Sequence, residues 1–205
     1  MMAQSNPARI LFLPGAGGSP DFWRPVGELL PSALPRAYFG WPGLGDQPHD
    51  PAVRGIEDLA RMVRAKMEGP VDLVAQSMGG VIASRLAIAE PKAVRRLVLT
   101  VTSGGVDMAG LGASDWRSDY RKSFPNAAAW ITAPIASPNL EVERIAAPTL
   151  LIWGDCDPIS PIAVGRHLES RLSNARLHIV KGGGHDLAKT HATAVALLIA
   201  QHLMA

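Results

Sequence analysis

The feature that most limits how this chain can fold is a series of short, uninterrupted apolar segments separated by stretches with helical periodicity. Such segments, bounded by glycine and proline, are typical of strands that are buried on both faces of a sheet. A helix between successive strands favours parallel pairing, because a parallel pair needs a crossover connection. The predicted strands are residues 10–13, 37–39, 71–75, 97–101, 149–153 and 177–180.

The stretches between these strands predict helices. Apolar residues recur at three- and four-residue spacing over residues 56–67 and 81–89, as they do on the buried face of a helix. Residues 162–172 and 187–203 complete the set. No internal repeat or low-complexity linker interrupts the pattern. We therefore expect one domain over residues 1–205, with a three-layer α/β fold and a mostly parallel sheet of about six strands.

One stretch breaks this alternation. Residues 106–146 show no strand pattern, and connections of this length are usually functional lids or disordered segments. We predict a short lid insertion there and call it the lid segment. Within it, Trp116, Tyr120 and Phe124 are spaced by four residues, so they share one face of a predicted helix.

Composition and charge exclude several classes of protein. Apolar residues make up 47% of the 205 residues and the net charge is only +2, so we expect a globular protein that does not bind nucleic acid. One cysteine, Cys156, rules out an internal disulfide, and without closely spaced metal ligands we expect no metal and no cofactor. The N-terminus predicts no signal peptide, and no apolar run reaches the roughly 18 residues of a membrane span, so we expect a cytoplasmic protein.

Residues 71–81 combine a strand, a tight turn and a helix around Ser77. This context is typical of a nucleophile elbow, in which a serine on a strained turn exposes its hydroxyl above the carboxyl edge of the sheet. The turn needs small neighbours, which Gly79 and Gly80 supply, whereas Ala75 stands where a glycine is usual. A serine before a helix is often a simple N-cap, but the preceding buried strand favours the nucleophile.

Two loops that follow later strands supply an acid and a base. Asp157 follows the fifth predicted strand, and His185 lies in a glycine-rich loop after the sixth. A serine hydroxyl needs a base to become a good nucleophile, and a carboxylate orients and stabilises the imidazole. The chain order Ser77, Asp157, His185 is the order expected for this architecture. Asp155 and Asp107 are rivals for the role of the acid, and we favour Asp157.

The loop after the first predicted strand reads Pro-Gly-Ala-Gly-Gly over residues 14–18. Such a loop could be merely flexible or could cradle a phosphate. A phosphate loop needs a lysine followed by serine or threonine, and neither this signature nor the dinucleotide fingerprint is present. We therefore interpret the loop as part of an oxyanion hole, in which the backbone amides of Ala16 and Met78 point at the carbonyl oxygen of the substrate.

Together these motifs resemble the α/β-hydrolase superfamily. The resemblance implies an α/β-hydrolase fold, with Ser77 as nucleophile, Asp157 as acid, His185 as base, and Ala16 and Met78 as oxyanion amides. The landmarks that carry it are Leu13-Pro14-Gly15-Ala16-Gly17-Gly18, Trp41-Pro42-Gly43-Leu44-Gly45-Asp46, Gln76-Ser77-Met78-Gly79-Gly80, and the pair Gly154-x-x-Asp157 with Gly184-His185.

The departures from the family pattern indicate a minimal member. Pro14 stands where histidine is usual, Gly40 stands where aspartate is usual, and the two customary N-terminal strands are missing from the prediction. The chain resembles small esterases, including pimeloyl-carrier-protein methyl ester esterases, in which basic lid residues meet an acidic carrier. The corresponding basic residues here, which could equally form a solvated face, are Arg117, Arg121 and Lys122.

We therefore expect a serine hydrolase that cleaves a carboxylic ester or thioester of a small acyl substrate, which a carrier protein could deliver. The expected substrate-binding residues are aromatic, and ordinary packing between lid and body is an equal alternative for them. Carbon–carbon bond hydrolysis, lyase or acyltransferase chemistry with the same triad stays open, as does a non-catalytic binding protein. The aromatic residues are Trp23, Trp116, Tyr120 and Phe124.

Overall fold

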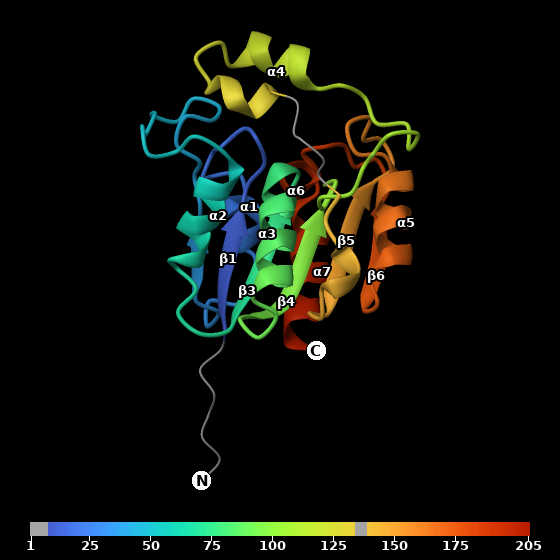
Figure 1. Cartoon of the computed structure of the whole chain (residues 1–205). Coiled ribbons are helices and arrows are strands. Elements are labelled where there is room, and N and C mark those ends of the chain that lie inside the picture. Colours follow the sequence, from blue (N-terminus) through green and yellow to red (C-terminus); the bar gives the residue numbers. More distant parts are fainter. Residues whose placement is uncertain (1–7, 134–138) are drawn as a thin grey trace.

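The computed structural model describes residues 8–133 and 139–205. At its centre is a sheet of six parallel strands in the order β2-β1-β3-β4-β5-β6 (Figure 1). All the strands of this sheet therefore present their carboxyl ends at one edge. The strands are β1 (Arg9–Leu13), β2 (Arg36–Tyr38), β3 (Val71–Gln76), β4 (Val94–Thr100), β5 (Thr149–Gly154) and β6 (Ala175–Val180).

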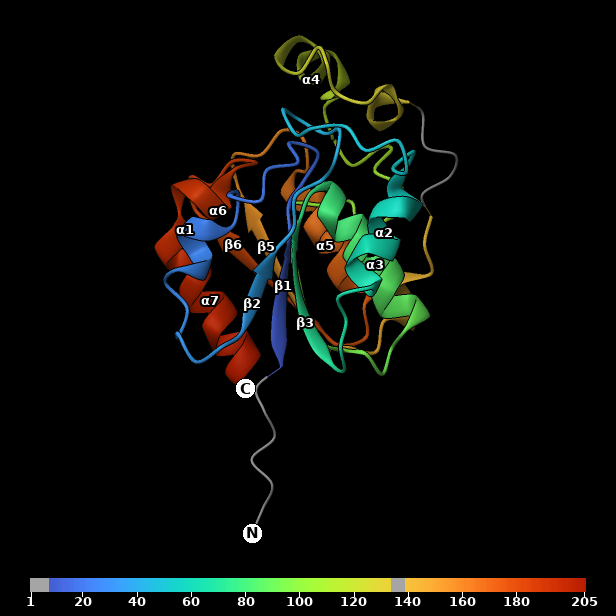
Figure 2. The same ribbon diagram turned by 90° about the vertical axis from the view of Figure 1, so that its left-hand side faces the viewer.

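Helices cover both faces of the sheet and complete three layers (Figure 2). Viewed along the sheet, α1, α6 and α7 lie on one face, and α2, α3 and α5 lie on the other. No helix within the described ranges is long and apolar enough to cross a membrane. These helices are α1 (Arg24–Gly27), α2 (Ile56–Arg64), α3 (Met78–Ala89), α5 (Ile162–Arg171), α6 (Leu187–Thr190) and α7 (Ala192–Met204).

The burial of each strand follows its place in the sheet. Every residue of β3 and of β5 is buried, because helices cover both faces of these central strands. In the edge strand β6 only Val180 is buried, and the other residues are partly or fully exposed. Continuous apolar sequence is what a strand covered on both faces requires, so the pattern that predicted these strands has a direct structural cause.

The order of the strands places a topological switch point at the carboxyl edge. β1 lies between β2 and β3, and the chain leaves β1 toward the face that carries α1 but leaves β3 toward the face that carries α3. The loops that follow these two neighbouring strands thus diverge. Open α/β sheets bind their ligands at such a switch point.

Most elements differ from their predicted bounds by one to three residues, and two of the differences have a clear structural cause. The helix predicted over residues 187–203 is broken at His191, whose φ of −126° and ψ of 35° are not helical. The break lets α6 bury Leu187 and Ala188, while α7 turns separately to pack along the sheet. β4 ends at Thr100 rather than at residue 101, because Val101 has a φ of 41° and leaves the strand.

The lid segment connects β4 to β5. Its described residues contain α4 (Arg117–Ser123), η1 (Ala129–Thr132) and η2 (Val142–Arg144), and α4 lies above the carboxyl edge (Figure 1). Residues 134–138 of the predicted insertion lie outside the described residues. The ring of Tyr120 lies 5.5 Å from that of Trp116 and 5.0 Å from that of Phe124, which confirms the predicted shared face. That the lid segment acts as a lid stays a prediction.

Candidate active site

Ser77 stands between β3 and α3 in a strained conformation. Its φ of 53° and ψ of −124° lie outside the regions that non-glycine residues usually occupy. It directly precedes α3, yet its side chain makes no capping hydrogen bond, so the N-cap alternative does not explain it. Its amide donates to Thr100 O (3.1 Å), and its carbonyl accepts from the amide of Gly80 (2.9 Å). The turn is thus held from both sides.

The residues around this turn must be small, because added side chains would clash with neighbouring atoms. A β-carbon added to Gly79 would lie 2.5 Å from the carbonyl oxygen of Pro14, and one added to Gly80 would lie 2.4 Å from Oγ1 of Thr102. A β-carbon on Gly15 would lie 2.9 Å from Cβ of Ser77. Real β-carbons do not approach other atoms so closely. The elbow therefore packs against the loop after β1 and against the end of β4 without room for side chains.

The structure brings Ser77, His185 and Asp157 into one chain of hydrogen bonds. Nε2 of His185 lies 3.0 Å from Oγ of Ser77, and Nδ1 of His185 lies 2.8 Å from Oδ2 of Asp157. A carboxylate only accepts, so Nδ1 carries the hydrogen and Nε2 is left to accept from the serine hydroxyl. The side chain of Asp157 is fully buried and that of His185 is 21% exposed. Acid, imidazole and hydroxyl are thus arranged for proton transfer from Ser77.

The rival acids make different contacts. Asp155 is exposed, and its carboxylate accepts from the amide of Gly182 at 2.6 Å, so it braces the glycine-rich loop before His185. Asp107 is also exposed and accepts from the amide of Ala109 at 2.9 Å. Neither aspartate makes a hydrogen bond to His185 within the described part of the chain. The geometry favours Asp157, as the sequence did.

Two backbone amides hold the Asp157 carboxylate in one orientation. Oδ1 accepts from the amides of Ile159 (2.8 Å) and Ser160 (3.2 Å), which leaves Oδ2 for the imidazole. Oγ of Ser160 donates in turn to Thr102 O (3.3 Å). The turn after β5 therefore fixes the orientation of the Asp157 carboxylate.

The loop after β1 is held through its carbonyl groups. Four successive carbonyl oxygens each accept a hydrogen bond, three of them from aromatic side chains. Within residues 8–133 and 139–205, the amides of Ala16 and Met78 donate to no protein atom, so both are free to donate to a substrate. The donors and acceptors are Trp23 Nε1 to Leu13 O (3.0 Å), Trp41 Nε1 to Pro14 O (2.8 Å), Gly18 N to Gly15 O (3.1 Å) and Tyr120 Oη to Ala16 O (2.8 Å).

The four aromatic residues expected in a substrate pocket fall into two groups. Trp23 is only 1% exposed and packs between Phe12 and Phe22, so it lies beneath the loop after β1 rather than on an open surface. The structure gives no support for its contact with a substrate. Trp116 and Phe124 are half-buried on either side of Tyr120, whose hydroxyl is engaged by the body of the protein. Trp116 and Phe124 keep accessible surface and remain candidates.

Two residues at this site were missed by the sequence reasoning. Thr102 is buried, and its hydroxyl donates to Ser77 O at 2.5 Å. Gln76 is also buried, and its side-chain amide donates to the carbonyl of His185 at 3.3 Å. Polar side chains at the ends of buried strands were the available signal, because a buried polar group needs a partner.

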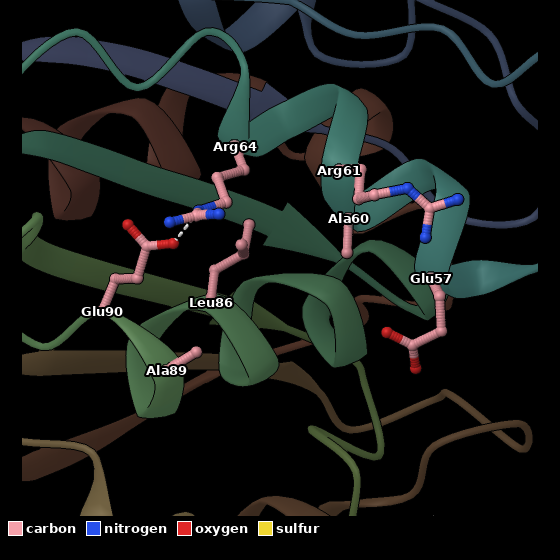
Figure 3. A pocket seen from close by; sticks show the side chains of 7 residues that line it. All are labelled: Glu57, Ala60, Arg61, Arg64, Leu86, Ala89 and Glu90. Carbon is pink, nitrogen blue, oxygen red and sulfur yellow. Dashed lines mark ion pairs between the residues drawn. The ribbon is translucent and has the colours of Figure 1, made fainter.

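A groove elsewhere is separate from this site. It lies between α2 and α3, has a volume of about 380 Å³ and carries an ion pair between Arg64 and Glu90 (Figure 3). None of the triad residues lines it. In the described part of the chain no group of three histidine, cysteine, aspartate or glutamate side chains is placed to hold a metal ion. The residues that line the groove are Glu57, Ala60, Arg61, Arg64, Leu86, Ala89 and Glu90.

Comparison with known proteins decides the family. The model of the alpha/beta hydrolase family matches residues 10–196, which is most of the chain. The chain belongs to the alpha/beta hydrolase family. The fold class expected from the sequence, an α/β-hydrolase fold with a parallel sheet of about six strands, is thereby confirmed.

Relatives of this hydrolase include esterases. A pimeloyl-[acyl-carrier protein] methyl ester esterase of Neisseria meningitidis is 26% identical, over 93% of this chain and 91% of the relative. A poly(3-hydroxyalkanoate) depolymerase of Ectopseudomonas oleovorans is 28% identical, over 95% and 83%. An alpha/beta hydrolase enzyme from the metagenome of lagoon sediments at Mar Chica, Morocco, superposes with a TM-score of 0.75 at 22% identity, over 95% of this chain and 89% of that chain.

Proposed function

We propose that this hydrolase cleaves a carboxylic ester or thioester of a small acyl substrate through an acyl-enzyme on Ser77. The single observation that carries the proposal is the hydrogen-bonded chain from Ser77 through His185 to the buried Asp157. The methyl ester esterase among the relatives supports the choice of an ester over other bonds.

The first half of the proposed reaction transfers the acyl group. Oγ of Ser77 attacks the carbonyl carbon while Nε2 of His185 takes the hydroxyl proton. The carbonyl oxygen becomes an oxyanion and accepts hydrogen bonds from the amides of Ala16 and Met78. When the intermediate collapses, the bond to the leaving oxygen or sulfur breaks, and His185 returns the proton to the departing alcohol or thiol. Asp157 stabilises the imidazolium that forms between these steps.

The second half restores the enzyme. Water attacks the carbonyl carbon of the acyl-enzyme, and His185 accepts its proton. The bond between the acyl carbon and Oγ of Ser77 then breaks, and His185 protonates Ser77 as the carboxylic acid leaves. His185 is thus used twice in this half, as the base toward water and as the acid toward Ser77.

Labelling and mutation test the proposal. We expect a fluorophosphonate probe to label Ser77 in the folded protein, and S77A to abolish both labelling and hydrolysis of p-nitrophenyl butyrate. D157N should lower kcat about 10⁴-fold, because the wrong imidazole tautomer is then favoured. D107N is the matched control and should keep full activity. A folded wild type that takes no label would instead indicate a binding protein.

We extend the proposal to an acyl group delivered by an acyl-carrier protein, because the relative from Neisseria meningitidis is named for such a substrate. Lys122 pairs with Asp119 (3.2 Å) and Arg117 pairs with Asp115 (3.0 Å), whereas Arg121 is exposed and forms no ion pair with the described residues. R121E should therefore raise KM for a carrier-bound acyl ester and leave KM for p-nitrophenyl butyrate unchanged. Equal effects on both substrates would refute a role in carrier binding.

A further inference from the structure

The hydroxyl of Tyr120 is shared between two loops of the body. It donates to the carbonyl oxygen of Ala16 (2.8 Å) and accepts from the amide of Gly45 (2.9 Å). The side chain is 9% exposed, and this burial raises the pKa of the phenol, so the hydroxyl keeps its proton and can go on donating. One side chain of the lid segment thus joins α4 to the loop after β1 and to the loop after β2.

These two loops also contact each other directly. A β-carbon on Gly45, which has a φ of 57°, would lie 2.1 Å from the carbonyl oxygen of Gly17. A β-carbon on Gly18 would lie 2.5 Å from the carbonyl oxygen of Leu44. The loops therefore meet backbone against backbone, so a displacement of one must displace the other.

The carbonyl that Tyr120 binds belongs to the residue whose amide serves the oxyanion hole. Trp23 and Trp41 hold the carbonyls of the two residues that begin the loop, and both indoles come from the body of the protein. The carbonyl of Ala16, further along the loop, accepts instead from Tyr120 of the lid segment. The Ala16 amide shares its peptide plane with the carbonyl of Gly15, which accepts from the amide of Gly18 (3.1 Å). Tyr120 holds the following peptide plane, so both planes that flank the Ala16 α-carbon are fixed and a shift of Ala16 is opposed.

We propose that Tyr120 is a positioning residue that aims the Ala16 amide at the developing oxyanion and so makes the oxyanion hole depend on the seating of α4. This proposal rests on the proposed esterase function. The proposal gives different roles to the three aromatic residues on and beside α4. Tyr120 serves the transition state, whereas Trp116 and Phe124 remain available to contact the acyl group.

The first test compares Y120F with Y38F. Phenylalanine keeps the ring of Tyr120 against Trp116 and Phe124 but removes the hydroxyl. We expect kcat for p-nitrophenyl butyrate to fall about tenfold with KM within twofold, which is a smaller loss than the roughly hundredfold or greater loss on removal of an oxyanion donor itself. Y38F removes the chain's other phenol, which makes no hydrogen bond to the described residues, and should change neither constant.

A second readout separates positioning from general destabilisation. A trifluoromethyl ketone forms a tetrahedral adduct with the serine, and its oxygen occupies the oxyanion hole. Y120F should weaken its inhibition by about the same factor as it lowers kcat. If kcat falls while the inhibition constant of the ketone is unchanged, or if kcat is unchanged, Tyr120 does not serve the oxyanion hole.

Amide hydrogen exchange tests whether Tyr120 holds the loop after β1, and it requires no activity measurement. Y120F should speed exchange in a peptide that covers residues 10–22, and Y38F should not. Unchanged exchange there in Y120F would overturn the proposal. If the wild type takes no fluorophosphonate at Ser77, the proposed function fails, and the exchange experiment still shows whether Tyr120 holds the loop.

Discussion

Replacing Thr102 with valine tests how the strained elbow is held in place. The hydroxyl of Thr102 donates to Ser77 O (2.5 Å) and accepts from the amide of Gly104 (2.9 Å), and the residue is 1% exposed. Valine keeps the shape of the side chain but leaves both backbone groups without this partner. A net loss of about 1–1.5 kcal/mol for each hydrogen bond predicts a loss of about 2–3 kcal/mol in the free energy of unfolding.

The same substitution should reduce activity. A non-glycine residue at the φ of Ser77 stores about 1–3 kcal/mol of strain, and release of roughly 1.4 kcal/mol of it would favour a relaxed, unproductive turn tenfold. We therefore expect T102V to lower kcat and the rate of fluorophosphonate labelling about tenfold. Urea denaturation, kinetics with p-nitrophenyl butyrate and labelling time courses measure the three quantities.

T102S is the matched control for this prediction. It keeps the hydroxyl and loses one methyl group, so it should cost about 1 kcal/mol of stability and leave the labelling rate within twofold of the wild type. Equal losses of labelling in T102S and T102V would refute the reasoning, because the hydroxyl would then not be the group that braces Ser77.

Two further substitutions test the fold around the site. G154A places a β-carbon 2.0 Å from the carbonyl oxygen of Gly183. We expect urea titrations to show a free energy of unfolding lower by about 1–3 kcal/mol. G55A, whose β-carbon would meet no atom within 4 Å, should lower it far less. Burial and the charge of Arg96 hold the pKa of His202 below its ordinary value of 6.5, so the unfolded chain takes up this proton first and stability falls as pH drops below about 6.5. H202Q should flatten the dependence of the urea midpoint on pH between 7 and 5, and an unchanged slope would contradict the assignment.

Local sequence was sufficient wherever one element carried the signal. The buried strands followed from unbroken apolar runs, and the nucleophile followed from a strand, a serine and two glycines within a few residues. Asp157 and His185 could be chosen because parallel strands deliver their following loops to one edge of the sheet. The structure brings these three side chains together, and their catalytic roles stay predictions.

Local sequence could not predict contacts between distant segments of the chain. Trp23 looked like a pocket residue because aromatic side chains are common there, yet its indole is bound to Leu13 O beneath the loop. The sequence could indicate that the hydroxyl of Thr102 needs a partner, but not that this partner is the carbonyl of Ser77. The break at His191 was hidden as well, because apolar residues continue on both sides of it.

What the sequence by itself determined is the layered α/β architecture, and it named the candidates for the reacting groups, since hydrophobic periodicity and residue type are local properties. Only the tertiary structure decided which partner each polar group takes. The hydrogen bond from Thr102 to the carbonyl of Ser77, and the bond from Tyr120 to the carbonyl of Ala16, 104 residues away, depend on how the chain packs in three dimensions. Buried hydrogen-bonding groups must find partners, but the sequence does not say which segments packing will bring within reach.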